Sequence, residues 1–188
     1  MRPFRYFLWF YDGFMKSPYD NALLRLLRSL SRYEVECVIC GGVAAVLHGV
    51  ERMTVDIDIS LKLSPENLAR FLEVMQKESM VPRAPVPPKS ILDLELLHRF
   101  YTEKHALVFT FIDPNNQYKQ IDFFLGDDKK YERLSVGSET FDVGENEFIR
   151  VVSLKTLIQM KEAVDPPRDK DLSDLKILRS ILKQKNSP

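Results

Sequence analysis

The segment that decides the fold runs from Cys40 to Ile59 and reads CGGVAAVLHGVERMTVDIDI. It contains the pair Gly41-Gly42, a short apolar run, and then a stretch in which polar and apolar residues alternate. A period of two is typical of a β-strand with one buried face, because successive side chains of a strand point to opposite faces. Asp56 and Asp58 are therefore predicted to lie side by side on one face of a strand, with an apolar layer behind them.

Two adjacent carboxylates repel each other, and a cation bound between them removes that cost. Oxygen ligands suit a hard ion, and Mg²⁺ usually takes one or two carboxylates together with the phosphates of a substrate. The Gly41-Gly42 pair fits the other half of such a site. Glycine lets the backbone approach a ligand closely, and N–H groups at the start of a helix favour phosphate. The segment therefore indicates a site for a metal ion and a nucleoside triphosphate.

A third carboxylate is expected from Asp122, which lies on the polar face of a predicted strand over residues 118–125. The turn 113–116 (Asp-Pro-Asn-Asn) separates this strand from another predicted over residues 106–112. By itself, a strand-borne Asp or a Gly-Gly pair is more often an ordinary polar face or a loop. The conjunction of Gly-Gly, Asp-x-Asp and a later Asp favours the metal–nucleotide interpretation.

This arrangement resembles the signature of the DNA polymerase β-type nucleotidyltransferase superfamily. The run from Arg52 to Asp58, with Thr54 between them, is similar to that of its minimal bacterial branch, the AbiEii/MenA toxin-like nucleotidyltransferases. Lys161 and the run Arg168–Leu175 resemble a second element of these proteins, K…[RK]-D-x-x-D-L. The resemblance implies an α/β (α+β) fold, with a nucleotidyltransferase-like mixed sheet flanked by helices and a helical C-terminal part.

Nucleotidyl transfer defines a role for each candidate residue. Asp56, Asp58 and Asp122 are the expected catalytic and metal-binding residues, with Asp122 on the side of the attacking hydroxyl as a ligand or general base. The other candidates are expected to bind the nucleotide: Gly41, Gly42, Arg52, Thr54, Lys161, Lys170 and Asp171.

The expected function is Mg²⁺-dependent transfer of a nucleoside monophosphate from an NTP to an unknown acceptor. The resemblance implies that the acceptor is RNA such as tRNA, or a protein, and that the chain is the toxin of a toxin–antitoxin pair with a cognate antitoxin. One alternative is a catalytically weak nucleotide-binding or partner-binding module of the same fold. Transfer to a small molecule such as an antibiotic is a third possibility.

Composition argues against several other kinds of protein, such as membrane proteins and proteins with a zinc or redox site. The 188 residues include 27 basic and 27 acidic side chains, so no net charge attracts nucleic acid, and an RNA contact would need a local basic patch. Cys37 and Cys40 lie in a strand-like segment without a second ligand pair, which favours buried thiols in a reduced cytoplasm over a zinc or redox site. No stretch is long and apolar enough for a membrane span, so a cytoplasmic protein is expected.

Three parts are expected along the chain: an N-terminal extension over residues 1–18, a nucleotidyltransferase core over 19–152, and a C-terminal helical part of the same domain over 153–188. The aromatic N-terminus is either a docking segment or a stretch that precedes a natural start at Met15, and the second interpretation is slightly favoured. The apolar spacing predicts helices over 19–32, 43–47, 65–78, 90–101 and 154–161 and from about residue 170, and strands over 34–40, 54–61, 132–136, 140–143 and 148–151. Residues 81–88 are expected to form an extended loop.

Smaller expectations concern single side chains. His48 is predicted to be structural, and Arg25, Arg28 and Arg32 are predicted to form a solvated helix face. In the last helix, the residues expected to face inward are Leu172, Leu175, Leu178 and Leu182.

Overall fold

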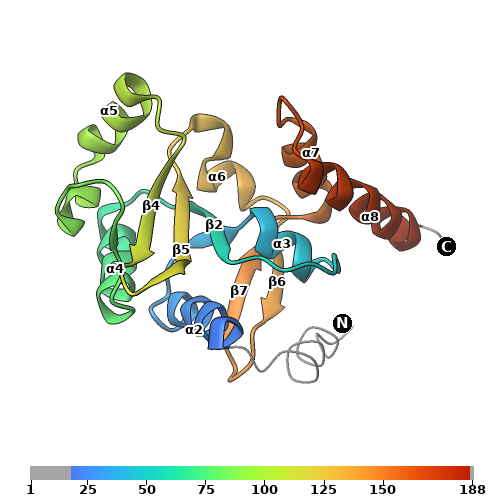
Figure 1. The fold of residues 1–188 in the computed structure, drawn as a ribbon, viewed down its shortest axis with the longest axis horizontal. Coiled ribbons are helices and arrows are strands. Elements are labelled where there is room, and N and C mark those ends of the chain that lie inside the picture. The colour runs from blue at the N-terminus through green and yellow to red at the C-terminus, as the bar shows by residue number, and fades with distance from the viewer. Residues whose placement is uncertain (1–17, 187–188) are drawn as a thin grey trace.

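The computed structural model describes residues 18–186 and shows a mixed α/β fold built on one seven-stranded sheet (Figure 1). The strand order is β3-β4-β5-β2-β1-β7-β6. The strands are β1 (Cys37–Ile39), β2 (Asp56–Leu61), β3 (Val81–Pro82), β4 (Val108–Asp113), β5 (Asn116–Phe124), β6 (Glu139–Asp142) and β7 (Phe148–Val151). The predicted extension lies almost entirely in residues 1–17, outside the described residues.

Two parallel contacts organise the sheet. β2 pairs with β5 and β1 pairs with β7 in parallel, whereas the other neighbours are antiparallel. A parallel partner requires a long crossover. The segment between β2 and β5 accordingly contains two helices and the short strands β3 and β4.

Helices enclose both ends of the sheet. Figure 1 shows α4 and α5 at one end of the molecule and α7 with α8 at the other. The helices are α2 (Pro18–Arg32), α3 (Gly41–Leu47), α4 (Pro65–Lys77), α5 (Leu94–Lys104), α6 (Tyr131–Leu134), α7 (Leu154–Glu162) and α8 (Asp169–Asn186), with 3-10 turns η1 (Pro88–Leu92) and η2 (Asp127–Lys129).

An aromatic cluster packs α4 against the apolar face of the sheet. The ring of Phe71 on α4 meets those of Phe111 and Phe123 edge-on, with centroids 5.7 and 5.8 Å away. Phe109 stacks on Phe123 at 5.4 Å. Phe71, Phe111 and Phe123 are fully buried, and the side chain of Ile57 in β2 is 1% exposed. This packing turns the opposite, polar face of β2 and β5 away from the core.

Local signals placed several elements correctly. Ser64 caps α4, its hydroxyl accepting from the N–H of Asn67, and Pro65 occupies the first turn. Ser153 caps α7 in the same way. The helix predicted over 90–101 begins later than expected: the 3-10 turn η1 ends at Leu92, and Asp93 caps α5, which starts at Leu94.

The strand predicted over residues 132–136 is wrong, because α6 occupies Tyr131–Leu134. Leu134 is buried and Tyr131 packs on the core, and their spacing of three places both on one face of a helix. In a strand Leu134 would share its face with Val136, which is 75% exposed. The helix predicted over 43–47 starts earlier, at Gly41, and the loop predicted over 81–88 contains β3.

The prediction that Leu172 faces inward is also wrong, since its exposure is 51%. The inward stripe of α8 contains Asp171, Asp174, Leu175 and Leu178, which are buried. This spacing follows the helical period, and Leu172 lies about 100° away from Asp171 around the helix axis. Two charged residues therefore take positions that an apolar pattern assigns to leucine.

The arginine face of α2 is ion-paired rather than merely solvated. Arg28 donates to Glu145 at 2.7 Å, and Arg32 pairs with Glu145 and with Glu147, the latter at 2.9 Å. Arg25 donates to Glu78 at 3.0 Å. These contacts link α2 to the β6–β7 hairpin and to the end of α4, but Arg25 and Arg32 stay 62 and 44% exposed, so their pairs add little stability and the face is also solvated.

Cys37 and Cys40 are free, buried thiols, as expected. Burial raises the pKa of the Cys37 thiol to about 12. The structural role expected for His48 is confirmed, because its Nε2 bonds the Val152 carbonyl at 2.8 Å. None of the described helices is long and apolar enough to span a membrane.

Candidate active site

Three carboxylates lie on the polar face of the parallel pair β2–β5. In the register of these strands Asp58 is the direct partner of Asp122, and Asp56 is the partner of Gln120. Thr110 of β4 pairs with Asp122 from the other side. The parallel pairing thus brings Asp122 next to a pair of carboxylates more than sixty positions earlier in the chain.

The surroundings of Asp58 disfavour the charged form of its carboxyl group. Burial, together with the charges of Asp56 and Asp122, raises the pKa of this carboxyl to about 6. A hydrogen bond from the Gly42 N–H and the charge of Lys170 act in the opposite direction. A bound cation would remove this accumulated repulsion.

Asp122 has one satisfied oxygen and one unsatisfied oxygen. The side-chain amide of Gln120 donates to Oδ2 at 3.1 Å, whereas Oδ1 is buried and has no hydrogen-bond partner. Burial raises the pKa of Asp122, and the charge of Asp56 adds to this, against the opposing influence of Thr110, Arg83 and Gln120. The Thr110 side chain interacts with the Asp122 carboxyl and opposes the rise of its pKa, but no group meets the geometry of a hydrogen bond to Oδ1. A buried unpaired oxygen of this kind commonly marks a position for a ligand, an ion or a reacting group.

Gly41 and Gly42 are required by steric fit at the start of α3. Gly41 has a φ of +58°, and a Cβ there would lie 1.8 Å from Oδ2 of Asp58. A Cβ on Gly42 would lie 2.4 Å from the hydroxyl of Thr54 and 2.7 Å from Arg52. The backbone of the pair therefore lies directly against the acidic strand and the segment that precedes it.

Thr54 and Arg52 lie in the segment before β2, and they contact a carboxylate of the site and helix α8, respectively. The Thr54 hydroxyl donates to Oδ1 of Asp56 at 3.0 Å. Arg52 forms an ion pair with Asp174 of α8, with Nε 3.1 Å from Oδ1. One residue thus orients a carboxylate of the site, and the other links the site to the C-terminal helices.

The C-terminal motif forms a charge cluster that joins α7 to α8. Lys161 lies 2.9 Å from Asp171 and 2.6 Å from Asp174, and Arg168 donates to Asp171 at 2.6 Å. The side chains of Lys161, Asp171 and Asp174 are 7, 1 and 1% exposed. We call these four residues, together with Arg52, the C-terminal charge cluster.

Two basic residues at the start of α8 lie within electrostatic reach of the carboxylates. Lys170 lowers the pKa of Asp58, and Asp58 and Asp56 in turn help Asp171 to raise the pKa of Arg168. Burial tends to raise the pKa of Asp171, but bonds from Arg168 and Lys161 outweigh it and hold the value below the usual range. Lys161 and Asp171 therefore neutralise each other, whereas Lys170 stays exposed beside the site.

The structure brings most of the predicted residues together. Asp56, Asp58, Asp122, Gly41, Gly42 and Thr54 form one group, and Arg52 links it to Lys161 and Asp171 in the cluster. Within the described residues, no three His, Cys, Asp or Glu side chains converge closely enough to hold a metal ion by themselves. The donor set nevertheless fits a hard cation, since Asp58 and Asp122 are neighbouring carboxylates and burial, together with the charges of Asp56 and Asp122, raises the pKa of Asp58.

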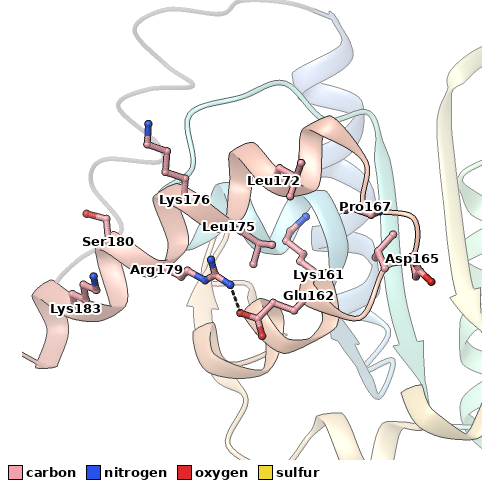
Figure 2. A pocket seen from close by; sticks show the side chains of 11 residues that line it. Lys161, Glu162, Asp165, Pro167, Leu172, Leu175, Lys176, Arg179, Ser180 and Lys183 are labelled. Atoms are coloured by element: carbon pink, nitrogen blue, oxygen red, sulfur yellow. Dashed lines mark hydrogen bonds and ion pairs between the residues drawn. The ribbon is translucent and has the colours of Figure 1, made fainter.

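A cavity of about 750 Å³ lies elsewhere, between α7 and α8 (Figure 2). Figure 2 shows Lys161 extending from α7 toward α8, and Arg179 reaching across to Glu162, 2.7 Å away. Leu172 and Leu175 line the same cavity. It borders the charge cluster but does not contain the three carboxylates.

Comparison with known proteins agrees with this geometry. Residues 23–185 match the family described as nucleotidyl transferase AbiEii toxin, type IV toxin–antitoxin system. The chain belongs to this family. It is accordingly a nucleotidyltransferase, as the resemblance of its motifs predicts.

A solved relative shares the fold of this AbiEii-family chain. It is the antibiotic-resistance factor ANT(2'')-Ia, known from a solution structure, with a TM-score of 0.50 and 14% sequence identity. The match covers 88% of this chain and 92% of that one. No curated protein sequence matches significantly.

Sequence reasoning missed four residues of the AbiEii-family site. Arg168 and Asp174 stand inside the C-terminal motif, and the spacing of Asp171 and Asp174 predicts one shared helix face, but neither Arg168 nor Asp174 was assigned a role. Thr110 and Arg83 had no signal of their own, because only the order of the strands places them near Asp122. The neighbour Gln120 was recognised as sharing a face with Asp122, but no role was assigned to it.

Proposed function

We propose that the chain transfers a nucleoside monophosphate from an NTP to a hydroxyl of RNA such as tRNA, or of a protein, with Mg²⁺ as cofactor. The proposal includes a role as the toxin of a pair with a cognate antitoxin, which the family suggests. The observation that carries it is the pairing of Asp58 with Asp122 across β2 and β5, where Oδ1 of Asp122 has no partner.

The three carboxylates would bind the metal ion and accept the proton of the attacking hydroxyl. Asp56 and Asp58 would hold Mg²⁺ together with Asp122, and the ion would supply charge neutralisation at the phosphates. Asp122 would receive the proton of the acceptor hydroxyl, whose oxygen forms a bond to the α-phosphorus as the bond to the leaving pyrophosphate breaks. Its raised pKa favours proton uptake, because a carboxylate with a higher pKa is a stronger base.

The remaining candidates would bind the triphosphate. Gly41 and Gly42 lie against Asp58, so a phosphate near that carboxylate meets their backbone at short range. Lys170 provides an exposed positive charge beside the site. Arg52, Lys161 and Asp171 would act on the nucleotide through the position of α8, because their charges are already paired.

The test uses the purified protein with each α-³²P-labelled NTP, Mg²⁺ and a whole-cell extract as the source of acceptors. Three proteins are compared: wild type, the Asp56→Asn/Asp58→Asn double variant, and a matched control, Asp127→Asn/Asp128→Asn, whose carboxylates are exposed. We expect labelled RNA or labelled protein with wild type and control, and none with the first double variant or after EDTA.

The same experiment decides the alternatives. Label in small molecules alone would contradict a macromolecular acceptor. If no nucleotide gave label while NTPs still raised the melting temperature, the chain would be a binding module. Label that persisted in the Asp56→Asn/Asp58→Asn variant would refute the role of these carboxylates.

A further inference from the structure

Asp122 is held by a chain of two hydrogen bonds that starts outside the carboxylate group. Arg83 donates from a terminal guanidinium nitrogen to Oε1 of Gln120 at 2.6 Å. Gln120 then donates from Nε2 to Oδ2 of Asp122 at 3.1 Å. The chain therefore runs from a cation through an amide to one specific carboxylate oxygen.

The orientation of the Gln120 amide follows from its two partners. A guanidinium group carries donors only, so the amide oxygen has to face Arg83. An ionised carboxylate carries acceptors only, so the amide nitrogen has to face Asp122. The opposite orientation would break both hydrogen bonds, and Gln120 thus has a single satisfactory position.

Strand order places Arg83 on the far side of Asp122 from Asp58. The Arg83 N–H donates to the Thr110 carbonyl at 2.9 Å, Thr110 pairs with Asp122, and Asp122 pairs with Asp58. The four residues form one row across the sheet. Gln120 lies two residues before Asp122 on the same strand face, in the row that contains Asp56 and Ile112.

We propose that Gln120, held by Arg83, is a positioning residue that fixes Asp122 through Oδ2 and reserves Oδ1 for the acceptor hydroxyl. The inference rests on the proposed function. The terminal torsion of an aspartate is broad and nearly two-fold, so a free side chain exchanges its two oxygens. The bond from Gln120 makes the oxygens unequal, because Oδ2 is engaged and Oδ1 is buried without a partner.

Two substitutions separate this role from simple space filling. Gln120→Leu removes both hydrogen bonds, and Gln120→Glu keeps the shape but replaces the amide donor with an acceptor that repels Asp122. We expect either change to lower kcat roughly 100-fold, the effect of a small misplacement of a reacting group. For Gln120→Leu the KM for the NTP should stay within about twofold, because Gln120 donates to Asp122, whereas Asp56 is bonded by Thr54.

The matched controls are Gln76→Leu and Gln76→Glu, at an exposed position of α4, and they should keep wild-type kinetics. If Gln120→Glu, folded with a wild-type melting temperature, kept kcat within about twofold of wild type, the inference would be overturned. An equal loss expressed in KM alone would overturn it too.

A second measurement needs no turnover and no metal. The side-chain amide signals of Gln120 in a ¹⁵N NMR spectrum should be distinct and slow to exchange, and should move in both Arg83→Met and Asp122→Asn. Signals that match a free, solvated glutamine would overturn the positioning role. Absence of any transfer by the wild-type protein, with the expected NMR result, would instead overturn the proposed function and leave only the contact with Asp122.

Discussion

Arg52 and Asp174 form an ion pair, 3.1 Å from Nε to Oδ1, that joins the segment before β2 to helix α8. The segment contains Thr54, whose hydroxyl bonds Asp56, so the pair connects a carboxylate of the site to the C-terminal helices. Asp174 also lies 2.6 Å from Lys161, and Lys161 is 2.9 Å from Asp171. The position of α8 and the position of the acidic strand are therefore coupled.

Removing the central cation of this cluster should destabilise the fold. Lys161→Met leaves Asp171 and Asp174 buried with only Arg168 and Arg52 as partners, and breaking a buried ion pair costs about 3–5 kcal/mol. We expect the lower part of that range in urea denaturation, because two arginines remain. Lys155→Met, at an exposed position of the same helix, should change the free energy of unfolding little. Equal stability of the two variants would contradict a structural role for Lys161.

Gly41→Ala should abolish transfer for a steric reason. The new Cβ would lie 1.8 Å from Oδ2 of Asp58, so the carboxylate or the backbone has to move. Gly137→Ala is the matched control, because Gly137 also has a positive φ, +71°, but nothing lies within 4 Å of its Cβ position. Both variants should lose about 1 kcal/mol of stability from the left-handed backbone. Only Gly41→Ala should lose NTP-dependent labelling, and activity in both would show that Asp58 tolerates displacement.

Asp58→Asn should stabilise the metal-free protein at high pH. The folded-state pKa of about 6 lies above the ordinary value of 3.8, so the folded chain binds more protons than the unfolded chain between these values. Wild-type stability therefore falls as pH rises through this window, by up to about 3 kcal/mol.

The variant lacks this ionisation, so its melting temperature in EDTA should exceed that of wild type at pH 8 and match it near pH 4. Asp128→Asn, an exposed carboxylate, should show no such difference. A constant difference at all pH values would mean that the charge of Asp58 is not the cause.

Lys119→Met should weaken the fold at neutral pH and reduce its acid sensitivity. Burial tends to raise the pKa of Glu78, but bonds from Lys119, Ser29 and Arg25 outweigh this and lower it. Glu78 thus contributes stability above its unfolded pKa of 4.5, and that contribution is lost as pH falls through the lower folded value. In the variant the loss should be smaller, as measured by melting temperature from pH 7 to pH 3. The control is Lys104→Met, at the exposed end of α5.

The acidic strand could be predicted because its information is local. Alternation around Asp56 and Asp58 specifies a strand face, and Ser64-Pro65 specifies the start of the next helix. Asp122 was chosen as the third carboxylate because it lies on the polar face of a second predicted strand, and the parallel register with Asp58 gives the physical reason for their proximity. Sequence alone gave no means to find Arg83, since its contact with Gln120 depends on β3 pairing with β4.

Charged residues in the core explain the failures in α8. Asp171 and Asp174 are 1% exposed, and an apolar pattern cannot assign them inward because burial of a carboxylate requires a partner from another helix. Lys161 is that partner, and its position on α7 is known only once the two helices pack. The wrong strand prediction at α6 has a different cause, because a few apolar residues fit a strand and a helix equally well.

The parallel pairing of β2 with β5 also determines when the site can exist during synthesis. A ribosome releases Asp56 and Asp58 long before Asp122, and releases Asp174 last. Because a domain folds as a unit, an emerging chain that carries Asp56 and Asp58 but not yet β5 and α8 lacks the partners that the site requires. The complete set of groups assembles only after Asp174 has left the ribosome, so translation products that stop before this residue lack it.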